Sequence, residues 1–199
     1  MINESLQFIA DELNKYLVLK MGPTTEPPRL VLGNVSRLFD GELAATGLVN
    51  KVIMSMVNVE EDRIAKQQEN FVRTDASTKY KSPPLYVNLY ILFSANRSGY
   101  GDSLQHLSYI MQFFQFQQVF TPITHPALEP TRIQKLIVDL CTLNFEQVNH
   151  LWSTLGGKYI PSVLYKVRQL TIDEDLTLSE SGFIKEVQIN DKVIQPVTS

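Results

Sequence analysis

The sequence predicts an α+β domain, with a mixed, mainly antiparallel β-sheet flanked by two to three helices. Five segments of strand length carry alternating or continuous apolar residues, and three other segments carry apolar residues at helical spacing. These strands and helices are interleaved along the chain, which favours helices packed on a sheet. A chain of 199 residues, 44% hydrophobic and 20% charged, is long enough to bury such a core in one domain.

Three helices are predicted from apolar residues that recur three and four positions apart. Asn3 is expected to cap the first helix, which ends before Gly22. Asp102 or Ser103 is expected to cap the second helix, after a turn that contains two glycines. Asn144 is expected to cap the third, which stops at a pair of glycines. The predicted ranges are 4–20, 103–117 and 145–155.

The strands differ in how much of their surface the sequence predicts to be buried. The strand over 51–59 is apolar on both faces, which is typical of a central strand covered from both sides. The last strand alternates apolar residues with Lys166 and Arg168, and this charged face indicates solvent, a sheet edge or a subunit interface. The predicted ranges are 29–35, 51–59, 85–95, 134–142 and 162–172, with irregular structure over 36–50.

The segment 60–83 differs in character from the rest of the chain. It holds five acidic and five basic residues and few large apolar ones. A solvated loop, a protruding hairpin and a helix outside the core are all compatible with this composition, and plain loops of this length tend to be functional. We expect one domain over 1–175, with 60–83 as a polar arm or loop within it. Residues 176–199 are expected to form a C-terminal tail, either extended or a hairpin around Asn190 and Asp191.

Composition excludes several classes of protein. The net charge of −3 and the pI of about 5.6 argue against nucleic-acid binding, which needs a basic surface. A single cysteine cannot form an internal disulfide, and the N-terminus lacks the basic and apolar regions of a signal peptide. No stretch of 18 apolar residues exists, so membrane insertion is not expected. These features predict a cytoplasmic protein.

No residue pattern indicates an enzyme, a cofactor site or a metal site. His106, His125 and His150 are far apart and match no metal-ligand spacing. Cys141 lies inside a predicted buried strand, where a lone cysteine behaves as a small hydrophobe. The glycines at 99 and 101 sit between a strand and a helix, where anions bind in some proteins, but turn chemistry explains them equally well. A cysteine-dependent enzyme is retained only as an alternative.

Four phenylalanines fall within eight residues, at positions 113, 114, 116 and 120. They cannot all lie on one face of a helix, so some are expected to face a partner or the following loop. Apolar patches of this kind often mark subunit contacts.

Three segments together resemble a known family. The first is Pro83-Pro84 followed by a strand with Asn88-Leu89-Tyr90, and the second is the helix from Leu104 to Phe116. The third is the helix with Trp152, followed by Tyr159-Ile160-Pro161-Ser162-Val163-Leu164-Tyr165. In this order and spacing the segments resemble the cap proteins of extracellular contractile injection systems, and the resemblance covers about residues 1–175.

The resemblance implies a tail terminator. Such a protein has a fold similar to phage tail terminators and forms a six-fold ring on the last layer of the inner tube and sheath, where it ends polymerisation and holds the sheath. The implied partners are further copies of this chain and the tube and sheath proteins, with no cofactor and no small-molecule substrate. An adaptor or baseplate component of the same particle, and a joining protein of a true phage, are the alternatives.

A ring of identical subunits uses heterologous contacts, and exposed arms and strand edges supply them. We therefore expect subunit contacts at the polar arm and at the charged face of the last strand. The expected interface residues are Arg63, Lys66, Phe71, Arg73, Lys166 and Arg168.

Overall fold

A computed structural model of the protein describes residues 1–23, 28–41, 47–62, 71–73, 77–81, 85–131, 133–172 and 177–182. The chain divides into two units, one made of Met1–Lys66 and Leu85–Ile172 and the other of Gln67–Pro84 and Asp173–Ser199.

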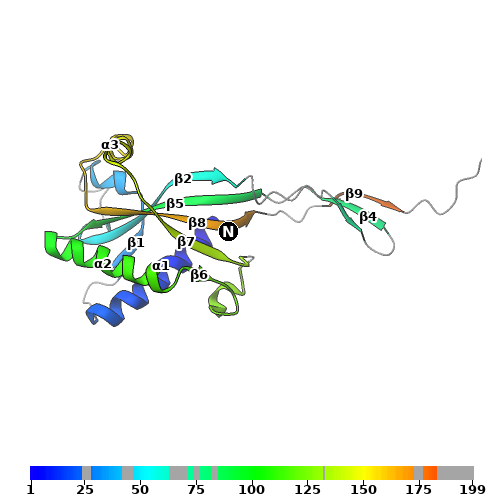
Figure 1. Ribbon diagram of the computed structural model, residues 1–199, viewed down its shortest axis with the longest axis horizontal. Helices are drawn as coiled ribbons and strands as arrows, with labels where there is room; N and C mark the ends of the chain where they lie inside the picture. The colour runs from blue at the N-terminus through cyan, green and yellow to red at the C-terminus, as the bar shows by residue number, and fades with distance from the viewer. Residues whose placement is uncertain are drawn as a thin grey trace, which may run out of the picture. The chain divides into compact units, whose positions relative to one another are not determined.

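The first unit is built on a six-stranded sheet with the strand order β1-β2-β5-β8-β7-β6 (Figure 1). β1 pairs parallel with β2, and all other neighbours in this sheet are antiparallel. Together with three α-helices this confirms the predicted fold class. The strands are β1 (Leu30–Leu32), β2 (Lys51–Glu61), β5 (Leu85–Asn96), β6 (Val119–Phe120), β7 (Leu136–Cys141) and β8 (Ser162–Ile172); the helices are α1 (Ile2–Met21), α2 (Tyr100–Phe116) and α3 (Phe145–Thr154), with 3-10 turns η1 (Val35–Leu38) and η2 (Pro126–Leu128).

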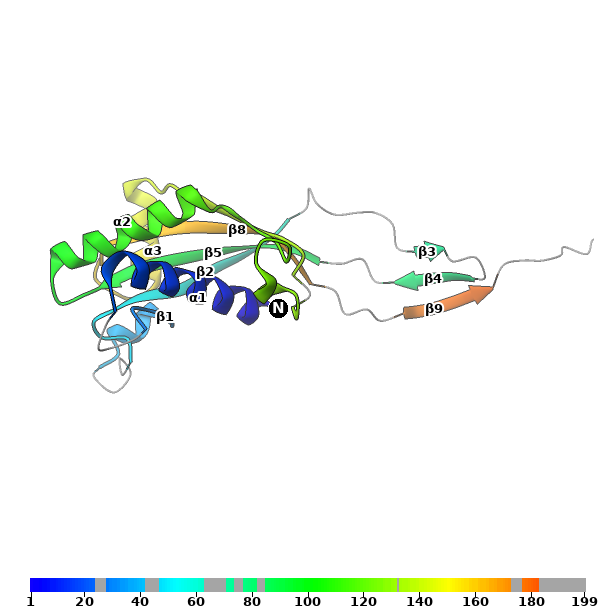
Figure 2. The same ribbon diagram turned by 90° about the horizontal axis from the view of Figure 1, so that it is seen from below.

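The larger core lies between one face of the sheet and the helices α1 and α2, which lie side by side (Figures 1 and 2). Aromatic rings fill its centre: the ring of Phe114 lies 5.8 Å from that of Phe93 and 4.6 Å from that of Tyr165. Burial raises the pKa of Tyr165 to about 12, because the phenolate cannot be hydrated there. Leu107, Ile110 and Phe114 of the predicted stripe of α2 lie in this core, whereas Leu104 and Met111, also predicted to belong to the stripe, are exposed.

Described residues cover the opposite face of the sheet at one end. There Val35 from η1 and Trp152 from α3 pack on Ile53, Leu92 and Leu164 from the strands. β2 is a central strand, as predicted, and a β-bulge interrupts it between positions 56 and 58. Beyond α3, the described part of this face presents the polar side chains of Glu60, Tyr90 and Lys166, which are partly or fully exposed.

The cap of α3 is formed as predicted. The Asn144 side chain accepts a hydrogen bond from the Gln147 amide at 2.8 Å, and the Gln147 side chain accepts one from the Asn144 amide at 2.9 Å. This capping box satisfies two amides that would otherwise lack partners at the start of the helix.

The other two predicted caps are wrong. α1 begins at Ile2, so Asn3 lies inside the helix, and the N-terminal amino group forms an ion pair with Glu4 at 3.1 Å. α2 begins one turn early, after Gly99, without a side-chain cap. Asp102 does not cap it because its carboxylate binds the side chain of Arg97 at 2.8 Å.

Several boundaries and short strands also differ from the prediction. The segment predicted as a strand over 29–35 divides into the three-residue β1 and the start of η1. β6 has only two residues and was not predicted, because a pair of residues carries no periodicity.

The second unit contains a three-stranded antiparallel sheet with the order β3-β4-β9. Its strands are β3 (Phe71–Arg73), β4 (Ser77–Lys81) and β9 (Thr177–Gly182). Of the three alternatives for the polar segment, a hairpin is therefore found over 71–81. The hairpin predicted around Asn190 and Asp191 lies outside the described residues.

Candidate interaction surfaces

A row of paired charged and polar side chains crosses the sheet face on which α3 packs, in the part that lies beyond α3. We call it the paired charge row, and its members are Glu60, Tyr90, Lys166, Asp139 and Arg168. Lys166 on β8 binds Glu60 on β2 at 2.8 Å, and the Tyr90 hydroxyl on β5 donates to the same carboxylate at 2.8 Å. The Lys166 ammonium also lies 5.2 Å from the centre of the Tyr90 ring. The hydrogen bond from Lys166 lowers the pKa of Glu60, and the same bond raises the pKa of Lys166.

The second expected cation of this strand is paired in the same way. Arg168 binds Asp139 on β7 at 2.6 Å, with both side chains partly exposed. β8 lies between β5 and β7, which removes the sheet edge as an explanation for its charged face. Lys166 and Arg168 thus present surface charges whose opposite partners belong to other strands of the same sheet, Glu60 on β2 and Asp139 on β7.

The other four expected interface residues belong to the polar segment. Arg63 and Lys66 lie outside the described residues. Phe71 and Arg73 lie in β3, where the structure defines the strand pairing alone. Their place in an interface remains a prediction.

A hollow of about 900 Å³ lies between α3 and the ends of β7 and β8, and we call it the α3 hollow. The indole nitrogen of Trp152 is buried in this region and has no hydrogen-bond partner among the described residues. Phe145, 96% exposed, stands at the wall of the hollow. The other lining residues are Leu92, Met111, Leu140, Cys141, Thr142, Leu143, Asn144, Val148, Asn149, Leu151, Ser153, Gly157, Tyr159, Ser162, Val163 and Leu164.

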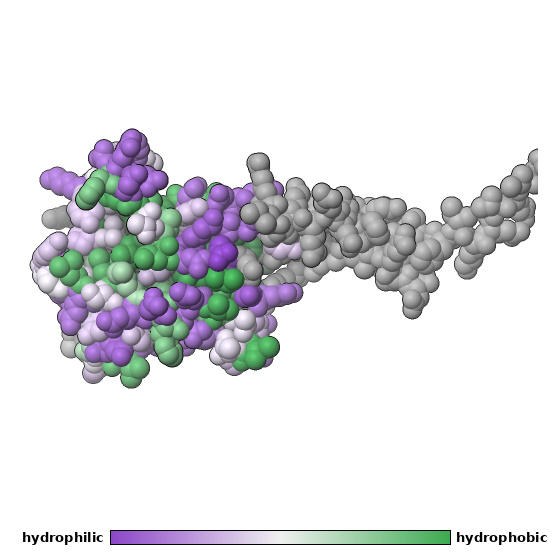
Figure 3. All heavy atoms as spheres, viewed as in Figure 1, coloured by the Kyte–Doolittle hydropathy of each residue, from purple (hydrophilic) through white to green (hydrophobic). Residues whose placement is uncertain are grey.

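A second hollow, of about 550 Å³, lies between α2 and β7, and we call it the α2 hollow. It shares Met111 and Leu140 with the α3 hollow, so the two hollows adjoin at these side chains, and we call them together the edge groove. Figure 3 shows hydrophobic residues gathered between α3 and α2 on the side that β7 crosses. The other residues of this hollow are Gln112, Phe114, Gln115, Phe116, Gln118, Val138 and Tyr165.

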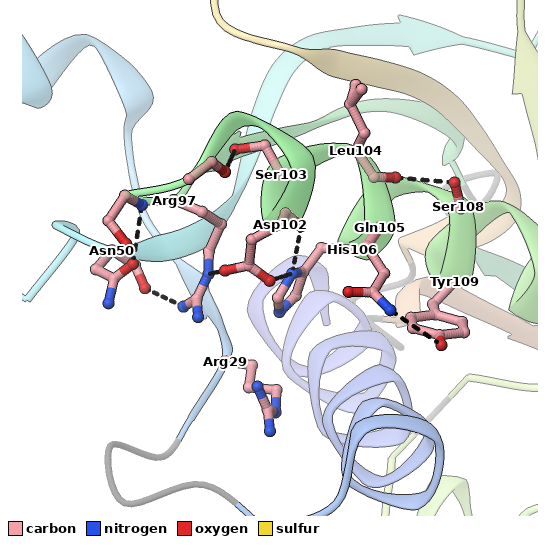
Figure 4. A network of polar contacts seen from close by, with 12 residues as sticks. Arg29, Asn50, Arg97, Asp102, Ser103, Leu104, Gln105, His106, Ser108 and Tyr109 are labelled. Atoms are coloured by element: carbon pink, nitrogen blue, oxygen red, sulfur yellow. Dashed lines mark hydrogen bonds and ion pairs between the residues drawn. The ribbon is translucent and has the colours of Figure 1, made fainter.

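The turn before α2 is held by a polar network (Figure 4). Arg97 binds Asp102 and the carbonyl of Asn50, and the Nδ1 of His106 lies 3.0 Å from the Asp102 carboxylate. Burial lowers the pKa of His106, and the cations Arg97 and Arg29 lower it further against the effect of Asp102. Asp102 places a carboxylate in the first turn of this helix, and this charge opposes anion binding. We therefore attribute the glycines at 99 and 101 to the turn and not to an anion site.

The remaining candidate catalytic residues are scattered. His125 contacts the ring of Phe120 at 5.1 Å beside η2, and His150 is exposed on α3. Cys141 is half-buried at the end of β7 rather than fully buried as predicted. In the part of the chain that the structure describes, no three histidine, cysteine, aspartate or glutamate residues form a group suited to a metal ion.

Sequence reasoning singled out Lys166 and Arg168 of the paired charge row but neither their partners nor the edge groove. The phenylalanine cluster was the one sequence signal for the edge groove. Phe113, Phe114 and Phe120 are buried, whereas Phe116 is 87% exposed on the wall of the α2 hollow. The exposure of Leu140 and Phe145 depends on where the sheet ends, which no local pattern encodes. None of the described helices has the length and apolarity to cross a bilayer.

These features define an α+β domain whose described surface offers a paired charge row and an uncharged groove, surfaces suited to contacts with other chains. The chain belongs to the Pvc16 N-terminal domain family, whose model matches residues 6–186. This match confirms the resemblance to cap proteins of extracellular contractile injection systems. No curated protein matches the sequence.

The solved structures that resemble the chain include two terminator or cap proteins. One is the sheath/tube terminator of the PVC extracellular contractile injection system in its extended state, with a TM-score of 0.55 and 12% identity over 94% of this chain. The other is the tube-terminating cap of the anti-feeding prophage, with a TM-score of 0.49 and 16% identity over 95% of this chain. The chain spans 65% and 60% of the lengths of these two proteins. The first likeness establishes a terminator-like fold.

Proposed function

We propose that this chain is a tail terminator that binds the end of the inner tube and sheath of a contractile injection particle. Membership of the Pvc16 N-terminal domain family carries the proposal. The fold shared with a sheath/tube terminator supports it, and so does the part of the sheet beyond α3 that no described residue covers. On this proposal the protein has a structural rather than an enzymatic function.

The proposal includes the organisation of the assembly. Residues 1–175 form the terminator domain, 60–83 act as an arm and 176–199 as a tail. Six copies close a ring through heterologous contacts, and the ring is assembled into the particle in the cytoplasm. Its partners are the tube protein, the sheath protein and further copies of itself.

The experiment that tests this function is assembly of the particle with and without the chain. Tube and sheath proteins are co-expressed with the labelled full chain, and particles are imaged by electron microscopy. The label is expected at one end, opposite the baseplate, and omission of the chain is expected to give particles of uncontrolled length. A label at the baseplate end would instead establish the adaptor alternative.

Removal of residues 66–80 tests the arm. This deletion takes out β3 and most of β4, which pair with each other and with β9 rather than with the six-stranded sheet. The larger unit is therefore expected to fold normally, as judged by circular dichroism, while ring formation on tubes is lost. Rings made by the deletion variant would contradict a function for the arm.

A charge exchange tests whether Lys166 contacts a partner. Lys166→Glu alone breaks the pair with Glu60, and the double variant with Glu60→Lys restores an opposite pair at the same place. If Lys166 binds a second chain, assembly is expected to fail in both variants. If assembly returns in the double variant, the lysine acts only within its own sheet.

A further inference from the structure

The edge groove has an exposed strand edge along its floor. The amide of Val138 donates to the carbonyl of Gln118 at 2.9 Å, so the backbone groups of Val138 point away from β8. Backbone groups alternate in direction along an antiparallel strand, so those of Leu140 point outward as well. Among the described residues, β6 pairs only with positions 136 and 137, and none pairs with Leu140 on its outer side. A further strand can therefore bond to β7 at this point.

The two hollows lie where the side chains of such a strand would point. Successive side chains of a strand point to opposite faces of the sheet. The α2 hollow opens on the face that carries Val138 and Tyr165, and the α3 hollow reaches the face that carries Leu92 and Leu164. A strand added to β7 would place alternate residues in the two hollows, one on each face.

The chemistry of the edge groove selects an uncharged occupant. Among the described residues, no aspartate, glutamate, lysine, arginine or histidine lines either hollow, although 20% of the chain is charged. A charged side chain placed there would lose its water without gaining a partner. The buried indole N–H of Trp152 lacks an acceptor among the described residues, and a backbone carbonyl of an incoming segment would supply one.

The opposite edge of the same sheet is blocked, which argues against a second copy as the donor. Asn14 of α1 binds both outward backbone groups of Leu30: its side-chain amide donates to the carbonyl at 2.8 Å, and its oxygen accepts from the amide at 3.0 Å. β1 has only three residues, so few other backbone groups on its outer side remain to pair with a strand. Edge-to-edge pairing of β1 in one copy with β7 in another is therefore disfavoured.

We propose that β7 accepts an added strand from a different protein, and that this strand is an extended, uncharged segment with apolar side chains on both faces. The inference deepens the proposed function by naming the kind of segment that a tube or sheath protein presents to this chain. Peptide binding tests it without tube or sheath protein, so its failure is distinct from a failure of the terminator function.

The probe is a peptide with the seven-residue core Val-Val-Thr-Val-Val-Thr-Val, which places valine on both faces of an extended strand. It is blocked at both ends and carries two flanking lysines at each end for solubility. Trp152 is the single tryptophan of the chain, so its fluorescence reports occupancy of the edge groove directly. Binding is expected to change that emission and to slow amide hydrogen exchange at Leu140 by about tenfold or more. The full chain is used throughout.

Two substitutions locate the binding. Leu140→Lys places a charge at the centre of the edge groove on a side chain that is already 51% exposed, so the fold should tolerate it. Peptide affinity is expected to fall by about tenfold or more, because the ammonium must be desolvated. The matched control is Leu104→Lys, on a side chain that is 44% exposed on α2 and lines neither hollow. It should leave affinity unchanged.

Methylation of the peptide backbone distinguishes strand addition from nonspecific hydrophobic binding. Methyl groups on alternate amides of the peptide block either the edge that faces β7 or the edge that faces solvent. One of the two methylated peptides is expected to lose binding and the other to keep it. Equal effects of the two would overturn strand addition, and so would failure of the peptide and of its leucine and phenylalanine analogues to bind.

Two other outcomes would assign the edge groove to this protein itself. If Leu140 is already protected in the free chain and loses protection on truncation after Gly182, the C-terminal segment is the occupant. If Leu140→Lys lowers the mass of a self-assembled species measured by light scattering, the occupant is a second copy. Either result overturns the proposal of a foreign strand.

Discussion

Two glycines of this chain differ in backbone conformation but not in the space around them. Gly156 ends α3 with a φ of +67°, a region that other residues enter at a cost, whereas Gly101 lies inside the first turn of α2. A Cβ at either position meets no atom within 4 Å. The two sites therefore differ in backbone conformation and not in available space.

This difference gives a matched pair of variants. Gly156→Ala is expected to lower the free energy of unfolding by about 1–2 kcal/mol, the cost of a left-handed L-residue. Gly101→Ala is expected to be neutral or stabilising by up to about 1 kcal/mol, because alanine favours a helix. Urea denaturation measures both, and an equal loss in the two variants would contradict the conformational explanation.

A buried histidine makes stability depend on pH. Because burial lowers the pKa of His106 in the folded state, the unfolded chain takes up a proton first as the pH falls below about 6.5. Stability is therefore expected to fall between that value and the lowered folded pKa, and to level off below it. His106→Asn, which retains a donor near Asp102, is expected to remove this part of the pH dependence in urea titrations.

The control for this effect is the exposed His150 on α3. His150→Gln should leave the change in stability between neutral and mildly acidic pH as it is in the natural chain. If both variants keep the full pH dependence, carboxylates rather than His106 cause it.

At the scale of elements, α3 depends on its first turn. It has only ten residues, and the capping box of Asn144 and Gln147 satisfies its first amides. Asn144→Ala is expected to cost about 1 kcal/mol of stability. In a double-mutant cycle with Gln147→Ala, the two losses should sum to more than the loss of the double variant, because each bond positions the other residue. Simple additivity would show that the two bonds act independently.

The long elements could be predicted because their patterns are strong and local. α1, α2 and the strands β2, β5 and β8 all fall close to their predicted ranges. β9 could not be predicted, because its residues lack apolar alternation and its pairing with β4 joins segments about a hundred positions apart. On α2, Leu104 and Met111 are seven residues apart and share a side of the helix that the core does not reach.

The candidate surfaces were predictable to different degrees. Lys166 and Arg168 stand out in the sequence because they interrupt an apolar strand, and the structure adds their partners Glu60 and Asp139. The edge groove was not predictable, because its residues come from α2, β7, β8 and α3 and are brought together only by the strand order. Local pattern identifies a face of an element, whereas a groove depends on which elements become neighbours.

At the scale of the whole molecule, the proposed terminator function predicts a defined assembly. Light scattering of the purified chain is expected to give six times the mass of 22.7 kDa if the ring forms before it meets a tube. A monomer mass would place ring closure on the tube end, and addition of tube protein should then produce the ring. A monomer both with and without tube protein would contradict the six-fold ring.

Asn14 has a consequence for the number of partners that one copy can hold through its sheet. It occupies the outward backbone groups of Leu30, so within the described residues β7 is left as the main site for strand addition. On the proposal above, the described part of the six-stranded sheet thus has a valence of one. Units joined through a valence of one combine into pairs and no further, so strand addition at this sheet alone cannot link copies into a fibre. Asn14→Ala would raise that valence to two and open a route to linear aggregates.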